Sequence, residues 1–101
     1  MTRSARIVRI MITGRVQGVG FRAFVEEEAR RRGLRGWVRN RSDGAVEAVL
    51  GGPTGAVSAA IEACRRGPSS AEVRALDVQE AETTALEQLL PGEDFSVLSN
   101  T

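Results

Sequence analysis

The sequence predicts an α+β sandwich, in which two helices cover one face of an antiparallel sheet of four to five strands. Two observations support this fold class. Apolar residues alternate at strand spacing in several short segments and recur at helical spacing in two longer ones, which gives the order β-α-β-β-α-β-β. Each predicted helix also has one apolar stripe, which is expected to pack against the sheet. The chain of 101 residues is predicted to be a single domain, residues 1–101.

The first strand and the first helix are predicted at residues 7–13 and 21–32. In the strand, branched apolar side chains share one face because they occupy every second position: Val8, Ile10 and Ile12. In the helix, apolar residues recur at helical spacing, and three consecutive arginines suit the negative end of the helix dipole. Gly33 then supplies a residue type that commonly ends a helix.

The middle of the chain is predicted to form a hairpin and a second helix. Strands at residues 36–40 and 45–50 flank an Asp-Gly pair, which favours a tight turn and antiparallel pairing. The second helix is predicted at residues 54–66, between two Gly-Pro pairs. Cys64 lies on its apolar stripe, so we expect an inert core thiol.

The last third of the chain is predicted to contain a strand, a short helical turn and a final strand. The strand at residues 72–79 is expected to contain a bulge, because its apolar residues do not alternate cleanly. The helical turn is predicted at residues 83–90 and the final strand at residues 95–98. These patterns leave the register after Ala81 open.

The composition excludes several kinds of site and partner. The chain has no histidine and one cysteine, so it cannot form an intrachain disulfide, a multi-cysteine metal site or a Ser-His or Cys-His nucleophile pair. Its net charge of +1 argues against binding to nucleic acid or to an anionic membrane through bulk electrostatic attraction. The N-terminal residues show neither a signal peptide nor a membrane span, so the expected location is the cytoplasm.

Residues 14–22 are the strongest candidate for a binding site. They read G-R-V-Q-G-V-G-F-R, which places a glycine-rich turn before the predicted helix and Arg22 in its first turn. No Ser, Thr, Asp or Asn occupies the capping position, so the first helical amides are free to bind a ligand. A cation is unfavourable at this end of a helix unless an anion binds there, although Glu26, Glu27 and Glu28 relieve part of the repulsion. The segment therefore predicts an anion site.

The residue pattern alone leaves other interpretations open. The glycines could serve a tight turn, with Arg22 a solvated surface charge, and Asn40 could be a strand-end residue that starts a turn. A nucleotide site is not expected. The segment lacks the Lys-Ser/Thr ending of a P-loop, and it does not match G-x-G-x-x-G followed by an acidic residue.

Two motifs together make the chain resemble the acylphosphatase family. Residues 14–22 match G-R-V-Q-G-V-x-F-R, and residues 36–40 read G-W-V-R-N, which matches G-W-V-x-N. The resemblance extends over residues 7–68 and continues more loosely to the end. It implies a ferredoxin-like fold and hydrolysis of the carboxyl-phosphate bond of small acyl phosphates, with no metal and no organic cofactor.

The resemblance also implies roles for individual residues. Arg22 would bind the phosphate and Asn40 would position the attacking water. Backbone amides would come from a phosphate-binding loop made of Arg15, Val16, Gln17, Gly18, Val19 and Gly20. The missing histidine is compatible with this activity, because the carboxylate leaving group needs no acid and phosphoryl transfer depends on positioning and charge. We expect the enzyme to act as a monomer.

Two other functions compete with this one. A nucleic-acid-binding module shares the architecture, but Glu47 and Val49 occupy the outward positions of the third strand, where stacking aromatic residues are needed. Trp37 and the phenylalanines are expected in the core or at its edge. The other alternative is a non-hydrolytic carbamoyl-phosphate-binding domain, like the one that begins hydrogenase-maturation carbamoyltransferases.

Residues 82–94 depart from the acylphosphatase pattern, because they form a longer link than usual into the final strand.

Overall fold

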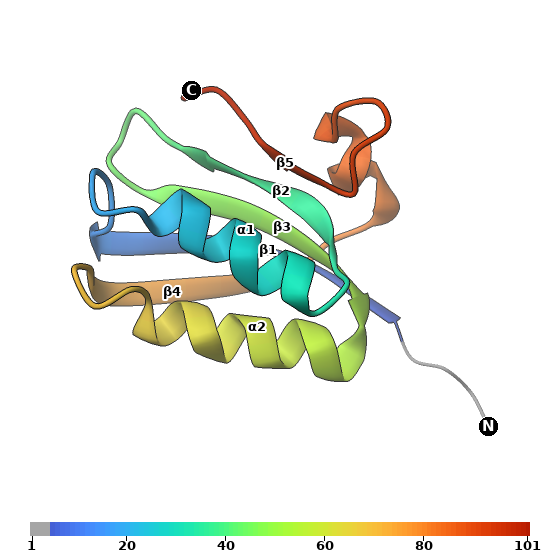
Figure 1. Ribbon diagram of the computed structural model, residues 1–101, viewed down its shortest axis with the longest axis horizontal. Helices are drawn as coiled ribbons and strands as arrows, with labels where there is room; N and C mark the ends of the chain where they lie inside the picture. Colours follow the sequence, from blue (N-terminus) through green and yellow to red (C-terminus); the bar gives the residue numbers. More distant parts are fainter. Residues whose placement is uncertain (1–4) are drawn as a thin grey trace.

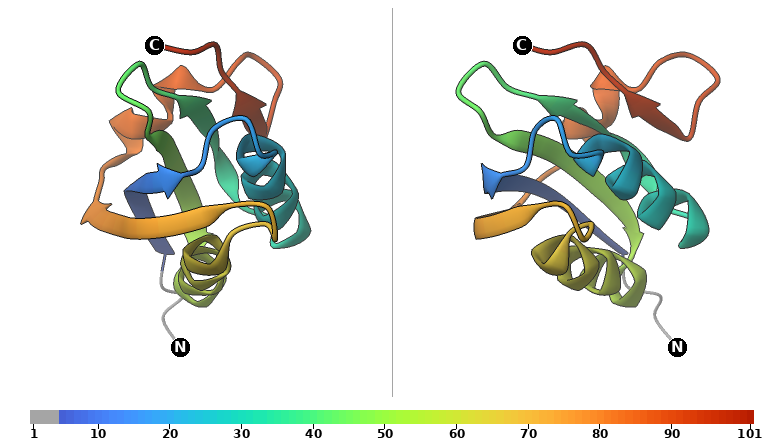
Figure 2. Two further views of the ribbon diagram at one scale, coloured as in Figure 1. Left: turned by 90° about the vertical axis from the view of Figure 1, so that its left-hand side faces the viewer. Right: turned by 60° about the vertical axis from the view of Figure 1, so that its left-hand side comes forward.

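The computed structural model describes residues 5–101, and it has the predicted order of elements (Figure 1). These are β1 (Ala5–Arg15), α1 (Phe21–Arg31), β2 (Arg35–Asn40), β3 (Val46–Pro53), α2 (Thr54–Arg66), β4 (Glu72–Glu80), the 3₁₀ helix η1 (Thr83–Gln88) and β5 (Phe95–Val97). Both α-helices lie on the same face of the sheet (Figure 2). The βαββαβ order of the first six elements is that of the ferredoxin-like fold, so the predicted fold class is confirmed.

The sheet contains five strands in the order β4-β1-β3-β2-β5. The first four strands pair antiparallel, as predicted, but β5 pairs parallel to β2, which makes the sheet mixed. The reason is geometric. β4 runs opposite to β2, so the last residues of β4 lie at the same end of the sheet as the first residues of β2. The chain enters β5 from that end, and β5 therefore runs in the same direction as β2. The prediction of a wholly antiparallel sheet was therefore wrong for the last strand.

The main core lies between the sheet and the two α-helices. The three residues predicted to share one face of β1 are completely buried in it: Val8, Ile10 and Ile12. Helix α1 contributes Phe21 and Val25, and α2 contributes an apolar stripe that includes Val57, Ala60, Ile61 and Cys64. The predicted core position of Cys64 is confirmed.

The other face of the sheet is more covered than the sequence suggested. Trp37 and Val49 pair across β2 and β3 on this face, and both are buried. The 3₁₀ helix η1 contacts these strands, and the indole Nε1 of Trp37 donates a hydrogen bond to the carbonyl oxygen of Ala85 at 2.7 Å. Glu47 is also buried here, and its carboxylate binds the guanidinium of Arg39 at 2.9 Å. The long link that contains η1 thus covers part of the face that a nucleic-acid-binding module would use.

Strand β4 contains the predicted bulge. Its register against β1 shifts between Thr13 and Gly14, because Thr13 faces Ala75 whereas Gly14 faces Val73. This shift leaves Arg74 without a partner on β1. Gly14 has a φ of +124°, and a Cβ atom there would clash with the carbonyl oxygen of Glu72. Only glycine fits at this point, just before the candidate loop.

Candidate phosphate site

The turn between β1 and α1 leaves the start of the helix open. Gly18 and Gly20 both adopt positive φ, at 75° and 81°, which non-glycine residues rarely adopt. Gly20 is the residue before the first helical turn, and no side chain within residues 5–101 caps the helix there. The first amides of α1 therefore remain donors at the positive end of the helix dipole. Such a helix start favours an anion.

The side chains of the turn anchor it to the rest of the fold. Gln17 Nε2 donates hydrogen bonds to the carbonyl oxygens of Arg41 and Ala45, at 2.8 and 2.9 Å. These two carbonyls belong to the hairpin between β2 and β3. Val16 is buried in the core, and the carbonyl oxygen of Val19 accepts a hydrogen bond from Ser70 Oγ at 3.0 Å. Because these groups hold the turn, its backbone faces the solvent at the exposed Gly18 and Gly20.

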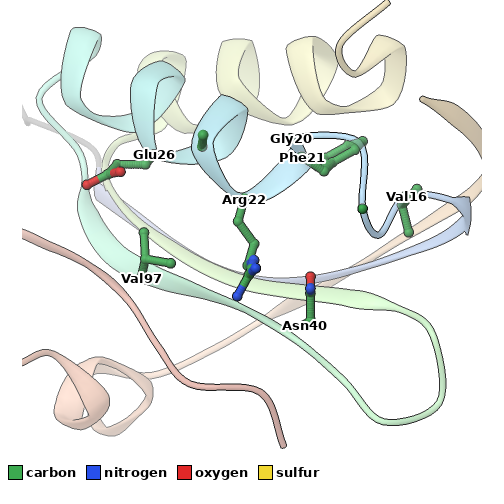
Figure 3. A pocket seen from close by; sticks show the side chains of 9 residues that line it. Val16, Gly20, Phe21, Arg22, Glu26, Asn40 and Val97 are labelled. Atoms are coloured by element: carbon green, nitrogen blue, oxygen red, sulfur yellow. The ribbon is translucent and has the colours of Figure 1, made fainter. Parts of the chain in front are cut away.

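Arg22 and Asn40 are 18 positions apart in sequence, but they line the same cleft. Figure 3 shows Arg22 extending from the first turn of α1 toward β2, where Asn40 projects into the same space. Asn40 is the last residue of β2 and is only 8% exposed, whereas Arg22 is half-buried. The two side chains reach the same cleft because α1 packs against β2.

The cleft has a volume of about 370 Å³ and an opening to solvent. Its lining combines the turn, the first half of α1, the end of β2 and the end of β5: Val16, Gly18, Gly20, Phe21, Arg22, Ala23, Glu26, Asn40 and Val97. Of the residues singled out from the sequence, three do not line it. Arg15 is the exposed last residue of β1, Gln17 binds the hairpin, and Val19 packs against the core.

The positive charge of Arg22 is free of carboxylate partners within residues 5–101. Two of the three glutamates that follow it bind arginines at the far end of α1 instead. Glu26 pairs with Arg30 at 3.0 Å, and Glu28 pairs with Arg31 at 2.6 Å. Glu26 nevertheless lines the same cleft as Arg22. The guanidinium, the free amides and the glycine backbone together suit an oxyanion such as phosphate.

One part of the site has no signal in the sequence. Residues 98–101 follow β5 and approach the cleft, where Asn100 Oδ1 accepts a hydrogen bond from Arg22 Nη1 at 3.1 Å. The amide of Thr101 donates to the carbonyl oxygen of Asn40, also at 3.1 Å. Neither residue belongs to a recognisable motif, and both contacts depend on the parallel docking of β5.

Two other kinds of site have no counterpart in the described part of the chain. Among residues 5–101, no group of three or more His, Cys, Asp or Glu side chains is arranged to hold a metal ion. No helix in the same range combines the length and the apolar character needed to cross a bilayer. The cleft at Arg22 therefore remains the leading candidate within this range.

Comparisons with known proteins match this geometry to one family. The family model for acylphosphatase matches residues 8–97, which include the turn, Arg22, Asn40 and β5. The chain belongs to the acylphosphatase family. An acylphosphatase from Rhodopseudomonas palustris strain BisB18 is 54% identical over 95 residues, which are 94% of this chain and 96% of that protein.

Solved structures extend the similarity to acylphosphatases in three dimensions. The crystal structure of acylphosphatase from Bacillus subtilis superposes with a TM-score of 0.79 at 41% identity, over 94% of this chain and 99% of that one. Full-length HypF in its phosphate- and nucleotide-bound form gives a TM-score of 0.83 at 28% identity. That match covers 99% of this chain but 13% of the HypF chain. The acylphosphatase fold thus also occurs as a small part of a longer protein.

Proposed function

We propose that this chain hydrolyses the carboxyl-phosphate bond of small acyl phosphates, with Arg22 binding the phosphoryl group and Asn40 positioning the attacking water. The observation that supports this most strongly is the common cleft. Among residues 5–101, the guanidinium of Arg22 has no carboxylate partner and the start of α1 has no side-chain cap. Both converge with the buried side chain of Asn40 in this cleft. The membership of the acylphosphatase family supports the same reaction.

The phosphoryl group would be bound by charge and by the backbone. The guanidinium of Arg22 offers a planar fork that can donate to two phosphate oxygens. Backbone amides of the loop at Val16, Gln17, Gly18, Val19 and Gly20 would supply the donors to the remaining phosphate oxygens, with Arg15 at the entrance to the turn. Such donors stabilise the charge that spreads over the equatorial oxygens in the transition state.

The water would be held by the side-chain carbonyl of Asn40 and would attack phosphorus in line with the leaving group. The new bond joins the water oxygen to phosphorus, and the bond between phosphorus and the acyl oxygen breaks. Its electron pair leaves with the carboxylate, and a phosphate oxygen accepts a proton from the water. Because a carboxylate is a good leaving group, no histidine and no covalent phosphoenzyme are required.

We also propose that one chain suffices for activity, because a single chain already brings Arg22, Asn40 and the turn together in one cleft. A single sedimenting species with the mass of the monomer, at the concentration of the assay, is the expected result. The cytoplasmic location stays a prediction from the sequence.

The test is the hydrolysis of benzoyl phosphate by the wild type, Arg22→Ala, Arg22→Lys and Asn40→Ala, with a metal chelator present. We expect Arg22→Ala to lose about 10² to 10³ in rate, as is typical when one preorganised donor is removed. Arg22→Lys should also lose most activity, since an ammonium group cannot reproduce the fork. Arg74→Ala is the matched control, because Arg74 is exposed on β4 and does not line the cleft.

Each result has a distinct meaning. A wild-type rate equal to spontaneous hydrolysis would contradict the proposed reaction, and loss of activity with the chelator would contradict its independence from metal. Phosphate binding without hydrolysis would favour the carbamoyl-phosphate-binding alternative. Full activity in both Arg22→Ala and Asn40→Ala would show that the site is elsewhere.

A further inference from the structure

Residues 98–101 run beside β2 and reach both side chains of the proposed site. The parallel pairing of β5 ends with Val97 opposite Val38. It continues irregularly, because the amide of Leu98 donates to the carbonyl oxygen of Val38 at 2.9 Å and the amide of Thr101 donates to that of Asn40 at 3.1 Å. Between these bonds the segment advances three residues while β2 advances two. The extra residue makes the segment bulge beside the cleft.

Asn100 lies in this bulge and contacts Arg22 directly. Its Oδ1 accepts a hydrogen bond from Arg22 Nη1 at 3.1 Å. A guanidinium has five N–H donors, so one is used by Asn100 and four remain for a ligand. A long arginine side chain at a half-buried position such as this otherwise has many rotamers, and ordering it on binding weakens affinity.

The chemistry of the acceptor matters as much as its position. An amide oxygen is neutral, so it orients the guanidinium without neutralising its charge. A carboxylate at the same place would form an ion pair with Arg22 and compete with phosphate. The main-chain bond from Thr101 to Asn40 fixes the segment at the end of β2, which keeps Asn100 near Arg22.

We propose that Asn100 is a positioning residue for Arg22, which holds the guanidinium with its remaining donors available to a phosphate group bound at the turn. This inference rests on the proposed function, in which Arg22 binds the phosphoryl group. It extends the site to a segment that follows the last strand. The segment contributes through Arg22 rather than by contact with the substrate.

The experiment measures the binding of inorganic phosphate to the wild type, Asn100→Ala and Ser99→Ala. Removing one hydrogen bond to the guanidinium should weaken phosphate binding about two- to tenfold in Asn100→Ala. The 15N and 1H resonances of Arg22 Nε should also shift and broaden in this variant. Ser99→Ala is the matched control in the same exposed segment, and it should bind phosphate like the wild type.

Asn100→Asp provides a second, independent variant. Its carboxylate should weaken phosphate binding more than Asn100→Ala at low salt, because it neutralises Arg22. Thermal unfolding of every variant shows that the comparison is made on folded protein. Phosphate binding as tight as in the wild type, or tighter, in either Asn100 variant would overturn the proposal. Tighter binding would mean that Asn100 competes with phosphate.

Arg22→Ala in the same series separates this inference from the proposed function. If Arg22→Ala binds phosphate like the wild type, the assignment of the phosphate site is wrong. If Arg22→Ala loses binding while Asn100→Ala keeps it, the phosphate site stands and only the positioning role of Asn100 is overturned.

Discussion

Raising the pH above about 9 should destabilise this protein through a single side chain, Cys64. Burial raises the pKa of its thiol from the ordinary value of 9.0 to about 12, and the carboxylate of Glu28 adds to the effect. Below pH 9 the thiol is protonated in both states, so the full stability is present. Between pH 9 and 12 the unfolded chain releases the proton while the folded protein keeps it, so stability falls as the pH rises.

The size of the loss follows from the shift in pKa. Each pH unit in this window should cost about 1.4 kcal/mol of unfolding free energy, which amounts to roughly 4 kcal/mol by pH 12. The amino-acid composition allows the pH dependence to be assigned to one group. It contains no histidine, tyrosine or lysine, and arginine stays protonated throughout the window, so Cys64 is the one side chain that titrates there.

The assay is urea denaturation of the wild type and of Cys64→Ala at several pH values between 8 and 11. Cys64→Ala should be less stable than the wild type at pH 8, because it leaves a small cavity, but its stability should change little with pH. The wild type should lose stability steadily above pH 9. Parallel pH profiles for the two proteins would show that the buried thiol is not the cause of the loss of stability.

Two further predictions concern the turn and the sheet. Gln17→Ala should lower the unfolding free energy by about 1–3 kcal/mol, since it removes two hydrogen bonds to the hairpin, whereas Gln79→Ala on exposed β4 should change it little. Equal stability of the two variants, measured by urea denaturation, would contradict the role of Gln17 as an anchor. Gly36→Ala should fail to fold stably, because its Cβ would clash with the carbonyl oxygen of Val49. Gly55→Ala is the contrasting variant, because a Cβ at this position in α2 meets open space, and it should stabilise the protein by about 1 kcal/mol. Circular dichroism with thermal unfolding checks both glycine variants, and a cooperative transition near the wild-type temperature in Gly36→Ala would contradict the packing argument.

The elements of the fold could be predicted because their signals are local. The alternation of Val8, Ile10 and Ile12 and the stripe that includes Cys64 each depend on a single segment. The parallel docking of β5 could not be predicted, because it depends on where a long link crosses the end of the sheet. The burial of Val49 was missed for the same reason, since η1 covers it from a distant part of the sequence.

The candidate site also contains some residues that local sequence signals predict and others that they do not. The open helix start and Arg22 could be inferred from the missing cap and from the inverted charge, which are adjacent in sequence. Asn40 was singled out only through the family resemblance, because a strand-end asparagine is common at turns. No motif or pattern in the sequence indicated Asn100. Its contact with Arg22 joins residues 78 positions apart and depends on the register of residues that follow β5.

In the proposed reaction, a water near Asn40 attacks the phosphorus of a substrate bound by Arg22. Hydrolysis of benzoyl phosphate in water enriched with oxygen-18, followed by mass spectrometry of both products, distinguishes this attack from attack on the carbonyl carbon. We expect the label to enter inorganic phosphate and benzoate to carry none. Label in the benzoate would mean that water attacks the carbonyl carbon, which is incompatible with the proposed reaction.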